Sequence, residues 1–581
     1  MIAAAAPAAL AQAIPSPVLP GRIERELQPP QEAPPALAPL LPPLAPEAPE
    51  TAPSGIEFEL KDVTFEGETV YTPAQIRAAV ASFIGKTMTV ENLPQLEEAI
   101  TVMYRRDGYI LSRAVVDAQT IDPQQGIVHL KIYEGYINEV RLDPLDYEVG
   151  EKGALVKSIL KKIAHACRDG DKPVGDKPCP LHRDTLERYL LLANDVPGVK
   201  VSAVIQPSSD AEGGADLFVT IEEHLFEFTG GLDNRGSSYV GPMSLHQSAA
   251  FNNLLGFYDR TEFHATQSIP INELFLINGV EEVPLTSEGL RAAMDFTFSR
   301  TRPGDVLRPL NLTTISNAGG LSFSYPLIRT RSANLQARAG FELRNSETTQ
   351  GLADATAFFD RTRVLTVGLS YDLADSWLGV NLADLSIGQG IPLLGATPER
   401  SQTSSHPGAS PSFTKFTGQI SRVQQIFPEW NLLGAASGQY SFSKLLSSEQ
   451  FGYGGEQYGR AFDPSEILGD RGIEFKAEVQ YTPAWGPAAM SWLPRLFDWP
   501  DTTRSLQLYG FYDIGRVWVD PGPSQQLSGA STGAGMRYTL SETLAGYIEV
   551  GFPLTRGVAS ERAKGQSGKA PRVFFSIATK F

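Results

Sequence analysis

The sequence is poor in the residues that most enzymes and nucleic-acid-binding proteins rely on. It has two cysteines and seven histidines among 581 residues. The histidines are scattered, and no metal-spaced cluster, nucleophile elbow or P-loop is present. We therefore expect no enzyme activity, no cofactor and no metal site. Lysine and arginine number 49 against 66 aspartate and glutamate, for a formal charge of −17. This acidic balance offers no basic face to phosphate and argues against a nucleic-acid partner.

Long apolar runs are also absent. No run reaches the ~18 residues that a transmembrane helix needs. A membrane β-barrel remains compatible with this absence, because its strands are short alternating segments. Glycine, tyrosine and phenylalanine, which number 53, 19 and 29, are well represented.

The first 54 residues carry export and linker signals. Residues 1–13 are small and apolar and end in an A-x-A pattern, as in the remnant of a signal peptide; a flexible alanine-rich tail is the alternative. The segment lacks a basic region, so we expect the natural start to lie upstream. Residues 14–28 contain a candidate short helix, and residues 29–54 are proline-rich and predict an extended linker. Disorder throughout 14–54 is the alternative, since short isolated helices are marginal in water.

Two small α/β modules follow. Residues 55–135 show strand, helix, helix, strand and strand patterns in that order. Residues 136–224 repeat the order with a diverged sequence. The closing strands are expected at Arg113–Ala118 and Ile127–Tyr133 in the first module, and at Val199–Val204 and Ala215–Ile221 in the second.

The two cysteines lie between the helices of the second module. Cys167 and Cys179 flank an 11-residue loop that contains glycine, aspartate, lysine and proline. In an exported protein we expect them to form a disulfide, worth ~2–4 kcal/mol. A metal site with His165 and His182 is the alternative, but the spacing fits no common zinc pattern.

From about Leu225 onward, helical periodicity gives way to strict alternation. One face of each segment is apolar and the other is polar or charged. The segments include Leu335–Leu343, Leu365–Leu373, Ile473–Tyr481, Leu544–Phe552 and Val573–Phe581. Residues 225–581 are too many for one soluble sandwich, which would turn its apolar face inward. We therefore predict a transmembrane β-barrel with an apolar lipid-facing surface, a wet lumen and roughly 14–18 antiparallel strands.

A long polar loop, from about Gly452 to Gly472, interrupts the alternation. It contains Arg460, and its tyrosines and Phe462 could anchor it. Asp513 lies in a later alternating segment and has the parity of the inward face, so Arg460 could reach it inside the lumen. A solvated arginine in an ordinary surface loop is the alternative, since surface ion pairs are common and weak.

Several of these patterns together resemble one family. The loop motif Gly459, Arg460, Ala461, Phe462 resembles V/I-R-G-F/Y, and Phe511, Asp513 and Gly515 resemble an F-x-D-x-G strand motif. Gly231–Gly236 opens the barrel, and the chain ends in Phe581, where the family carries a C-terminal assembly signal. With two POTRA-like modules ahead of the barrel, the chain resembles the TpsB-type transporters of two-partner secretion, the ShlB/FhaC/HecB-like branch. Ala461 departs from the motif, which has a glycine and a tight backbone approach at this position.

The resemblance implies a sixteen-stranded barrel in the outer membrane of a Gram-negative bacterium, with both POTRA modules in the periplasm. The helix in 14–28 would be a plug in the lumen, tethered by 29–54. The Arg460 loop would fold back into the lumen and reach Asp513.

The implied activity is export of a large β-rich, TpsA-like exoprotein without ATP. The strand edges Arg113–Ala118 and Ala215–Ile221 would capture this partner, because an extended client can add a strand to an exposed edge. Outer-membrane lipid and the barrel-assembly machinery are the other implied partners. An assembly factor that inserts other barrels and a passive porin with periplasmic binding modules are the alternatives.

Overall fold

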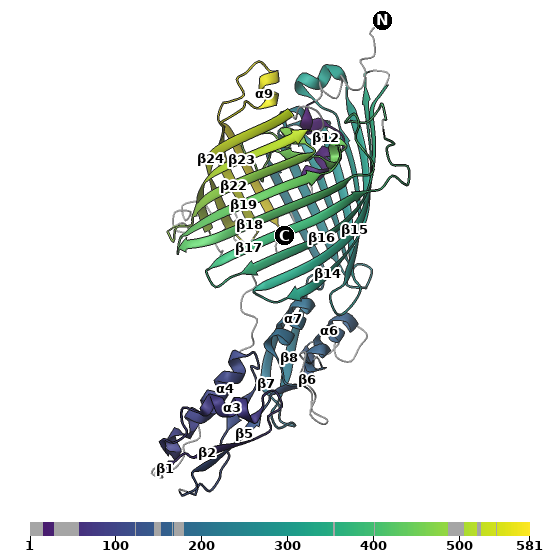
Figure 1. Ribbon diagram of the computed structural model, residues 1–581. Helices are drawn as coiled ribbons and strands as arrows, with labels where there is room; N and C mark the ends of the chain where they lie inside the picture. The colour runs from purple at the N-terminus through teal and green to yellow at the C-terminus, as the bar shows by residue number, and fades with distance from the viewer. Residues whose placement is uncertain are drawn as a thin grey trace.

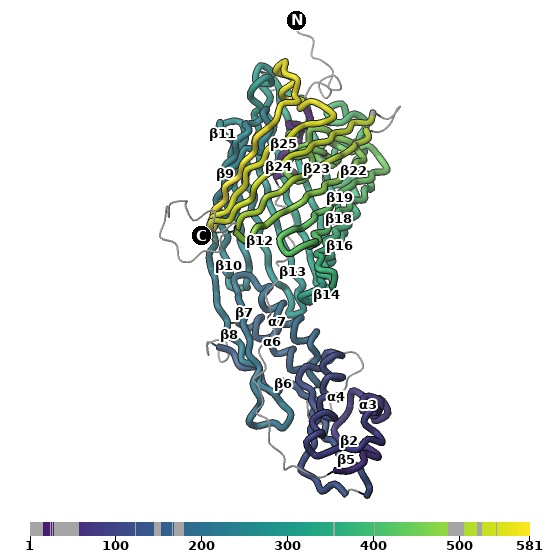
Figure 2. Tube along the Cα trace, turned by 90° about the vertical axis from the view of Figure 1, so that its left-hand side faces the viewer, coloured from purple at the N-terminus to yellow at the C-terminus, as the bar shows by residue number. Residues whose placement is uncertain are grey.

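A computed structural model of the chain describes residues 15–27, 57–122, 124–143, 153–165, 167, 179–351, 355–399, 401–485, 505–519, 525–541 and 543–581. The expected signal remnant and the proline-rich linker lie outside these residues. Two small modules extend from one end of a large closed barrel, and a short N-terminal segment lies inside the barrel near its other end (Figures 1 and 2). No helix in the described ranges is long and apolar enough to cross a membrane.

Sixteen antiparallel strands close the barrel, each hydrogen-bonded to the next. They are β9 (Phe226–Asp233), β10 (Met243–Asn252), β11 (Arg260–Ile269), β12 (Leu274–Pro284), β13 (Arg291–Thr301), β14 (Thr313–Arg329), β15 (Ala333–Gln350), β16 (Ala355–Ala374), β17 (Gly379–Gly390), β18 (Thr414–Phe427), β19 (Trp430–Ser441), β22 (Arg471–Tyr481), β23 (Ser505–Val519), β24 (Gln525–Ser541), β25 (Leu544–Pro553) and β26 (Arg572–Lys580). Short helices η3 (Ser238–Val240), η4 (Asp305–Leu310) and α9 (Ala559–Ala563) lie in the connections at the end away from the modules.

Alternation along the strands places apolar side chains outside and charged ones inside, as predicted. On β22 the outward Phe475 and Val479 are 46% and 48% exposed, whereas the inward Glu474 and Glu478 are 6% and 1% exposed. Exposed large apolar side chains recur on most of the other strands. A surface of this kind is stable only against lipid, because water would leave the apolar area unburied.

The chain terminus closes the barrel. β26 pairs with β9 over five residue pairs. Phe581 extends this pairing: its N–H donates to the Phe228 carbonyl at 2.8 Å, and the Phe228 N–H donates to the Phe581 carbonyl at 3.0 Å. The two rings stack with their centroids 6.4 Å apart. The last residue therefore takes part in the seam that joins the first strand to the last.

The first module has the predicted order of elements. It contains β1 (Glu57–Glu59), β2 (Asp62–Glu66), α3 (Pro73–Val80), β3 (Thr87–Thr89), η2 (Val90–Asn92), α4 (Leu93–Arg106), β4 (Arg113–Val115) and β5 (Ile127–Tyr133). Thr72 and Gln75 form a capping box that starts α3. The sheet order is β2-β5-β4, so β4 is an edge strand as expected, although it ends at Val115 rather than Ala118.

The second module repeats this plan and corrects one prediction. It contains β6 (Tyr136–Asp143), α6 (Ala154–His165), α7 (Arg183–Asn194), β7 (Val199–Pro207) and β8 (Gly214–Glu223). The sheet order is β6-β8-β7, so the segment Ala215–Ile221 is the central strand and not an exposed edge. Both of its backbone edges are already paired, which prevents a client strand from adding there. The edges of this sheet are β6 and β7.

The second module is fixed to the barrel through α7. Asp195, just after this helix, accepts two hydrogen bonds from Arg329 at the end of β14, at 2.8 and 2.6 Å. Leu192 lies against Gly289 in the turn between β12 and β13, a position with φ +89° where a Cβ would meet the leucine at 2.7 Å. A two-point ion pair and a close apolar contact thus set the direction in which the modules leave the barrel.

Candidate functional site inside the barrel

The polar loop lies inside the lumen and is longer than predicted. It joins β19 to β22 and covers residues 442–470, so it begins about ten residues before Gly452. It contains η5 (Ser447–Glu449) and a short hairpin of β20 (Phe451–Tyr453) and β21 (Ile467–Gly469). The earlier start was not predicted, because residues 442–451 contain none of the glycines that mark residues 452–472 as a loop.

Arg460, at the tip of this loop, is paired with Asp513 on β23. Its Nε donates to Oδ2 at 3.0 Å, its Nη2 donates to Oδ1 at 2.9 Å, and its backbone N–H donates to Oδ2 at 3.0 Å. Arg460 is 4% exposed and Asp513 is 0% exposed. The planar guanidinium matches the carboxylate at two points, which fixes direction as well as distance. This is the pair expected from the loop and strand motifs.

Four further charged residues surround the pair, and none of them was predicted. Glu478 on β22 accepts from Arg460 Nη1 at 2.5 Å and from Arg537 on β24 at 2.6 Å. Glu549 on β25 lies 3.8 Å from Arg460 Nη1 and accepts from Arg235 at 2.7 Å. The charges alternate in sign, so each buried carboxylate faces a guanidinium and each guanidinium faces a carboxylate.

Arg235 also supports the loop directly. Its Nη1 donates to the Arg460 carbonyl at 3.1 Å, and its Nε donates to the Tyr547 hydroxyl at 2.8 Å. Arg572 makes a similar contact one residue further on, where its Nη1 donates to the Ala461 carbonyl at 3.1 Å. The backbone of the loop tip is therefore held by one arginine just after the first strand of the barrel, β9, and by another at the start of the last strand, β26.

Aromatic side chains of the loop fill gaps left by glycines in the wall. Phe462 and Tyr453 are buried and their ring centroids lie 5.9 Å apart. A Cβ on Gly529 would meet Tyr453 at 2.6 Å and Phe462 at 3.3 Å, and a Cβ on Gly515 would overlap the Tyr453 ring. The glycine of the strand motif thus has a steric role. Phe511 has another role: its ring centroid is 3.6 Å from the Arg460 Cζ, a cation–π contact.

The departure at Ala461 is accommodated by the opposite wall. Ala461 is fully buried, and its backbone is not in the left-handed region. Its Cβ lies 3.1 Å from where a Cβ on Gly551 of β25 would be. Because Gly551 has no side chain, the methyl group of Ala461 fits against the wall, and the loop backbone still lies close to β25. Gly459, at φ +69°, supplies the turn that aims the arginine.

The N-terminal segment lies in the same lumen. It consists of η1 (Ser16–Val18) and α2 (Arg22–Glu26), a shorter helix than the 14–28 segment expected to contain it. Arg25 donates to Glu449 at 2.7 Å, and Arg22 donates to the Gln450 carbonyl at 2.8 Å and to Ser465. These three partners, Glu449, Gln450 and Ser465, belong to the loop.

The outer end of this segment is held by apolar contacts. Val18 packs in a cluster of buried residues from the barrel strands and the connections at the far end of the barrel. The cluster contains Tyr239, Val240, Leu274, Leu307, Leu312, Ala357 and Phe358. Gly21, with φ +74°, brings the backbone close to Ser448. A cavity of about 580 Å³ remains between the helix, the loop and β9–β10.

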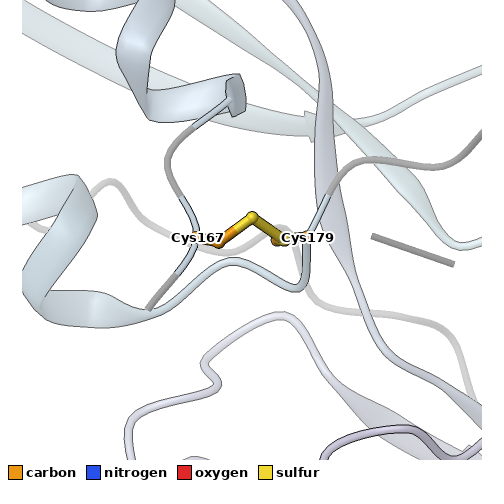
Figure 3. The surroundings of a disulfide bond; sticks show 2 residues. All are labelled: Cys167 and Cys179. Atoms are coloured by element: carbon orange, nitrogen blue, oxygen red, sulfur yellow. A yellow bond between two sulfur atoms is a disulfide. The ribbon is translucent and has the colours of Figure 1, made fainter. Parts of the chain in front are cut away.

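The two cysteines form a disulfide in the second module, with Cα atoms 5.4 Å apart (Figure 3). Both sulfurs are used in this bridge, so they are not the ligands of a metal site with His165 and His182. His182 instead caps α7, where its Nδ1 accepts from the Asp184 N–H at 3.2 Å.

The closed barrel, its periplasmic modules and the loop inside its lumen define a transporter of the outer membrane. Residues 217–537 match the protein family described as "Haemolysin secretion/activation protein ShlB/FhaC/HecB". Residues 58–135 match the domain family described as "POTRA domain, ShlB-type". The chain belongs to this ShlB/FhaC/HecB family, whose members are outer-membrane transporters of two-partner secretion with POTRA modules in the periplasm.

Individual relatives agree with this assignment. The chain is 25% identical to the outer membrane transporter CdiB of Dickeya dadantii over 437 residues, which are 74% of this chain and 73% of that protein. It is 23% identical to the heme/hemopexin transporter protein HuxB of Haemophilus influenzae, covering 87% of this chain and 85% of that protein. The solved structure of CdiB from Escherichia coli has the same fold, with a TM-score of 0.67, 21% identity and 94% coverage of both chains.

Proposed function

We propose that this transporter captures one large β-rich exoprotein through its POTRA modules and passes it through the barrel to the cell surface. The observation that carries the proposal is the filling of the lumen. One filling element, the loop 442–470, is joined to the wall at both ends, while the other, the segment 15–27, is held in the described residues by side-chain hydrogen bonds to the loop and by apolar packing. A channel through which the exoprotein passes as an extended chain must be able to open. The segment 15–27 can leave the lumen without disturbing the strands of the wall.

Capture is assigned to the exposed sheet edges of the modules. In the first module the edges are β2 and β4, of which we assign β4, and in the second module the edges are β6 and β7. An extended segment of the exoprotein can hydrogen-bond to such an edge, and the side chains on each side of it can set selectivity. Outer-membrane lipid is the proposed partner of the apolar outer face, and the barrel-assembly machinery is the proposed reader of the terminal strand that ends in Phe581.

Deleting residues 56–134 tests the capture role. The first module has a hydrophobic core of its own, so the barrel should still fold and shift its electrophoretic mobility on heating. Secretion of the exoprotein encoded with this chain should stop. Continued secretion by a correctly inserted barrel would show that the first module does not capture the cargo.

The two alternative functions are less well supported. A passive porin needs an open lumen, but in the part of the chain that the structure describes the lumen holds both the loop and the helix. An assembly factor for other barrels shares the superfamily fold. Depleting this chain should then lower the amount of other outer-membrane barrels, whereas a dedicated transporter should leave them unchanged.

A further inference from the structure

The residues that follow the disulfide form the contact between the two POTRA modules. We call Cys179–Arg183 the joint segment. It lies between the disulfide and α7, and Cys179 through His182 are all buried. Its first residue is covalently tied to Cys167, two residues beyond the end of α6. The segment is therefore anchored at both ends within the second module.

The backbone of the joint segment bonds to the first module and to the connection between the modules. The Leu181 N–H donates to the Gly135 carbonyl at 2.8 Å, and Gly135 lies between β5 and β6. The Arg183 N–H donates to the Gly108 carbonyl at 2.8 Å, just beyond the C-terminal end of α4. These backbone bonds can form only if the segment lies in a fixed position beside the end of α4.

The His182 side chain completes the contact. Its Nδ1 accepts from the Asp184 N–H at 3.2 Å, so its Nε2 carries the proton and can donate to the Asp107 carbonyl, 3.0 Å away. The ring lies edge-on to Tyr109, with centroids 5.2 Å apart. Gly108 has φ +99°, and a Cβ there would overlap the imidazole. One histidine thus caps a helix of the second module and bonds to the end of a helix of the first.

We propose that the Cys167–Cys179 disulfide serves mainly to hold the joint segment against the first module, and so fixes the angle between the two POTRA modules. The bridge limits the conformations of the undocked segment. Less conformational entropy is therefore lost when the segment docks against the first module. Without the bridge, the joint segment is joined directly to α7 but to α6 only through the length of chain 166–178. The angle then becomes free even though each module keeps its own core.

The fixed angle has a consequence that rests on the proposed function. It holds the edge strand β4 at one distance and direction from the β6-β8-β7 sheet. An extended client that contacts both modules then finds its two binding edges already aligned, which lowers the entropy lost on binding.

Hydrogen–deuterium exchange on the purified full chain in detergent tests the proposal without reference to secretion. In the Cys167→Ser/Cys179→Ser variant, the Leu181 and Arg183 amides and peptides covering 104–112 should exchange about tenfold faster or more, because the joint opens locally. The matched control is Val156→Ala, which removes apolar contact from the first turn of α6, at the opposite end from Cys167. It should speed exchange in α6 and α7 and leave peptides 104–112 unchanged.

A second variant tests the joint with a substitution in the first module. Gly108→Ala keeps the disulfide but places a methyl group against His182, and should speed exchange at Leu181 and Arg183 as well. The proposal is overturned if the double serine variant changes exchange only within α6 and α7, as the control does, or if Gly108→Ala leaves the joint amides protected. Secretion assays on the same variants then separate the two ideas: a loosened joint with normal secretion contradicts the functional consequence and leaves the structural role standing.

Discussion

The two elements inside the lumen are attached in different ways. The loop 442–470 continues into wall strands at both ends, and its Arg460 is 4% exposed beside a fully buried Asp513. The segment 15–27 is held by Arg22, which is 5% exposed, and by Arg25, whose side chain is 28% exposed beside the fully buried Glu449. Losing Arg460 leaves the fully buried Asp513 without this partner, whereas losing the segment 15–27 removes Arg22 and Arg25 together and leaves the buried Glu449 paired with Lys415 at 2.9 Å. The comparison indicates a fixed loop and a removable helix.

The dependence between the two elements runs in one direction. The polar partners of the helix, Glu449, Gln450 and Ser465, belong to the loop, whereas the partners of Arg460 belong to the wall. Displacing the loop should therefore remove these polar contacts and leave the helix held by its apolar contacts with the wall. Removing the helix should leave the Arg460 network in place, because none of its bonds involves residues 15–27.

Breaking the attachment of the loop to the wall should have the largest effect on secretion. Arg460→Ala and Asp513→Ala each remove one side of a buried pair, a change that costs ~3–5 kcal/mol. Insertion should be normal, because the ladder hydrogen bonds hold the wall. Secretion should fall by about tenfold or more, since ~1.4 kcal/mol already corresponds to tenfold in an equilibrium. Exoprotein in the medium and proteolysis of the loop are the measurements.

A double-mutant cycle provides the control for this prediction. If Arg460 and Asp513 act as one unit, the double variant should be little worse than either single variant. Two defects that add in full would show that the residues act independently, and the loop would then need another explanation for its position.

Removing the helix should have the next largest effect, but on conductance rather than on secretion. Deleting residues 14–30 takes away α2 and its contacts with the loop. Single-channel conductance in planar bilayers should rise, while secretion persists. The substitution Arg25→Gln is a milder version, because it weakens the bond to Glu449 without shortening the chain and leaves Glu449 paired with Lys415. Unchanged conductance after the deletion would mean that the helix does not block the channel.

Filling a glycine gap in the wall should have an intermediate effect. Gly515→Val places a side chain where the Tyr453 ring lies and should push the loop away at a cost of ~1–3 kcal/mol. Gly510→Val on the same strand is the matched control, since a Cβ there has its nearest neighbour at 3.9 Å and the position is exposed. Secretion should drop only in the first variant. Equal loss in both would point to a general effect of valine on the strand.

The smallest effect is expected at the rim of the charge network. The Arg537 side chain is 39% exposed although it bonds to the buried Glu478. Arg537→Ala leaves Glu478 with its bond to Arg460, so the cost should be ~0–1 kcal/mol and secretion should fall by no more than a few-fold. A loss as large as that of Arg460→Ala would show that Glu478 depends on both arginines.

Elements with a local signal in the sequence could be predicted. Period-two alternation decides which face of a strand meets lipid, so the barrel and the inward parity of Asp513 could be predicted. Helical spacing and the repeated order of elements predicted both modules. The close spacing of Cys167 and Cys179 in an exported chain predicted their disulfide, because short loops bring the two sulfurs together.

Which of the inward charged residues contact Arg460 depends on the tertiary structure and could not be predicted. Glu478 and Glu549 have the right parity, but so do many other charged residues of the barrel, and strand register around a closed sheet selects the few that reach Arg460. The central place of β8 was mispredicted for a related reason: strand order in a sheet depends on which partners pair, and alternation carries no record of it. The glycine gaps for Tyr453 and the joint between the modules likewise exist only where distant segments touch.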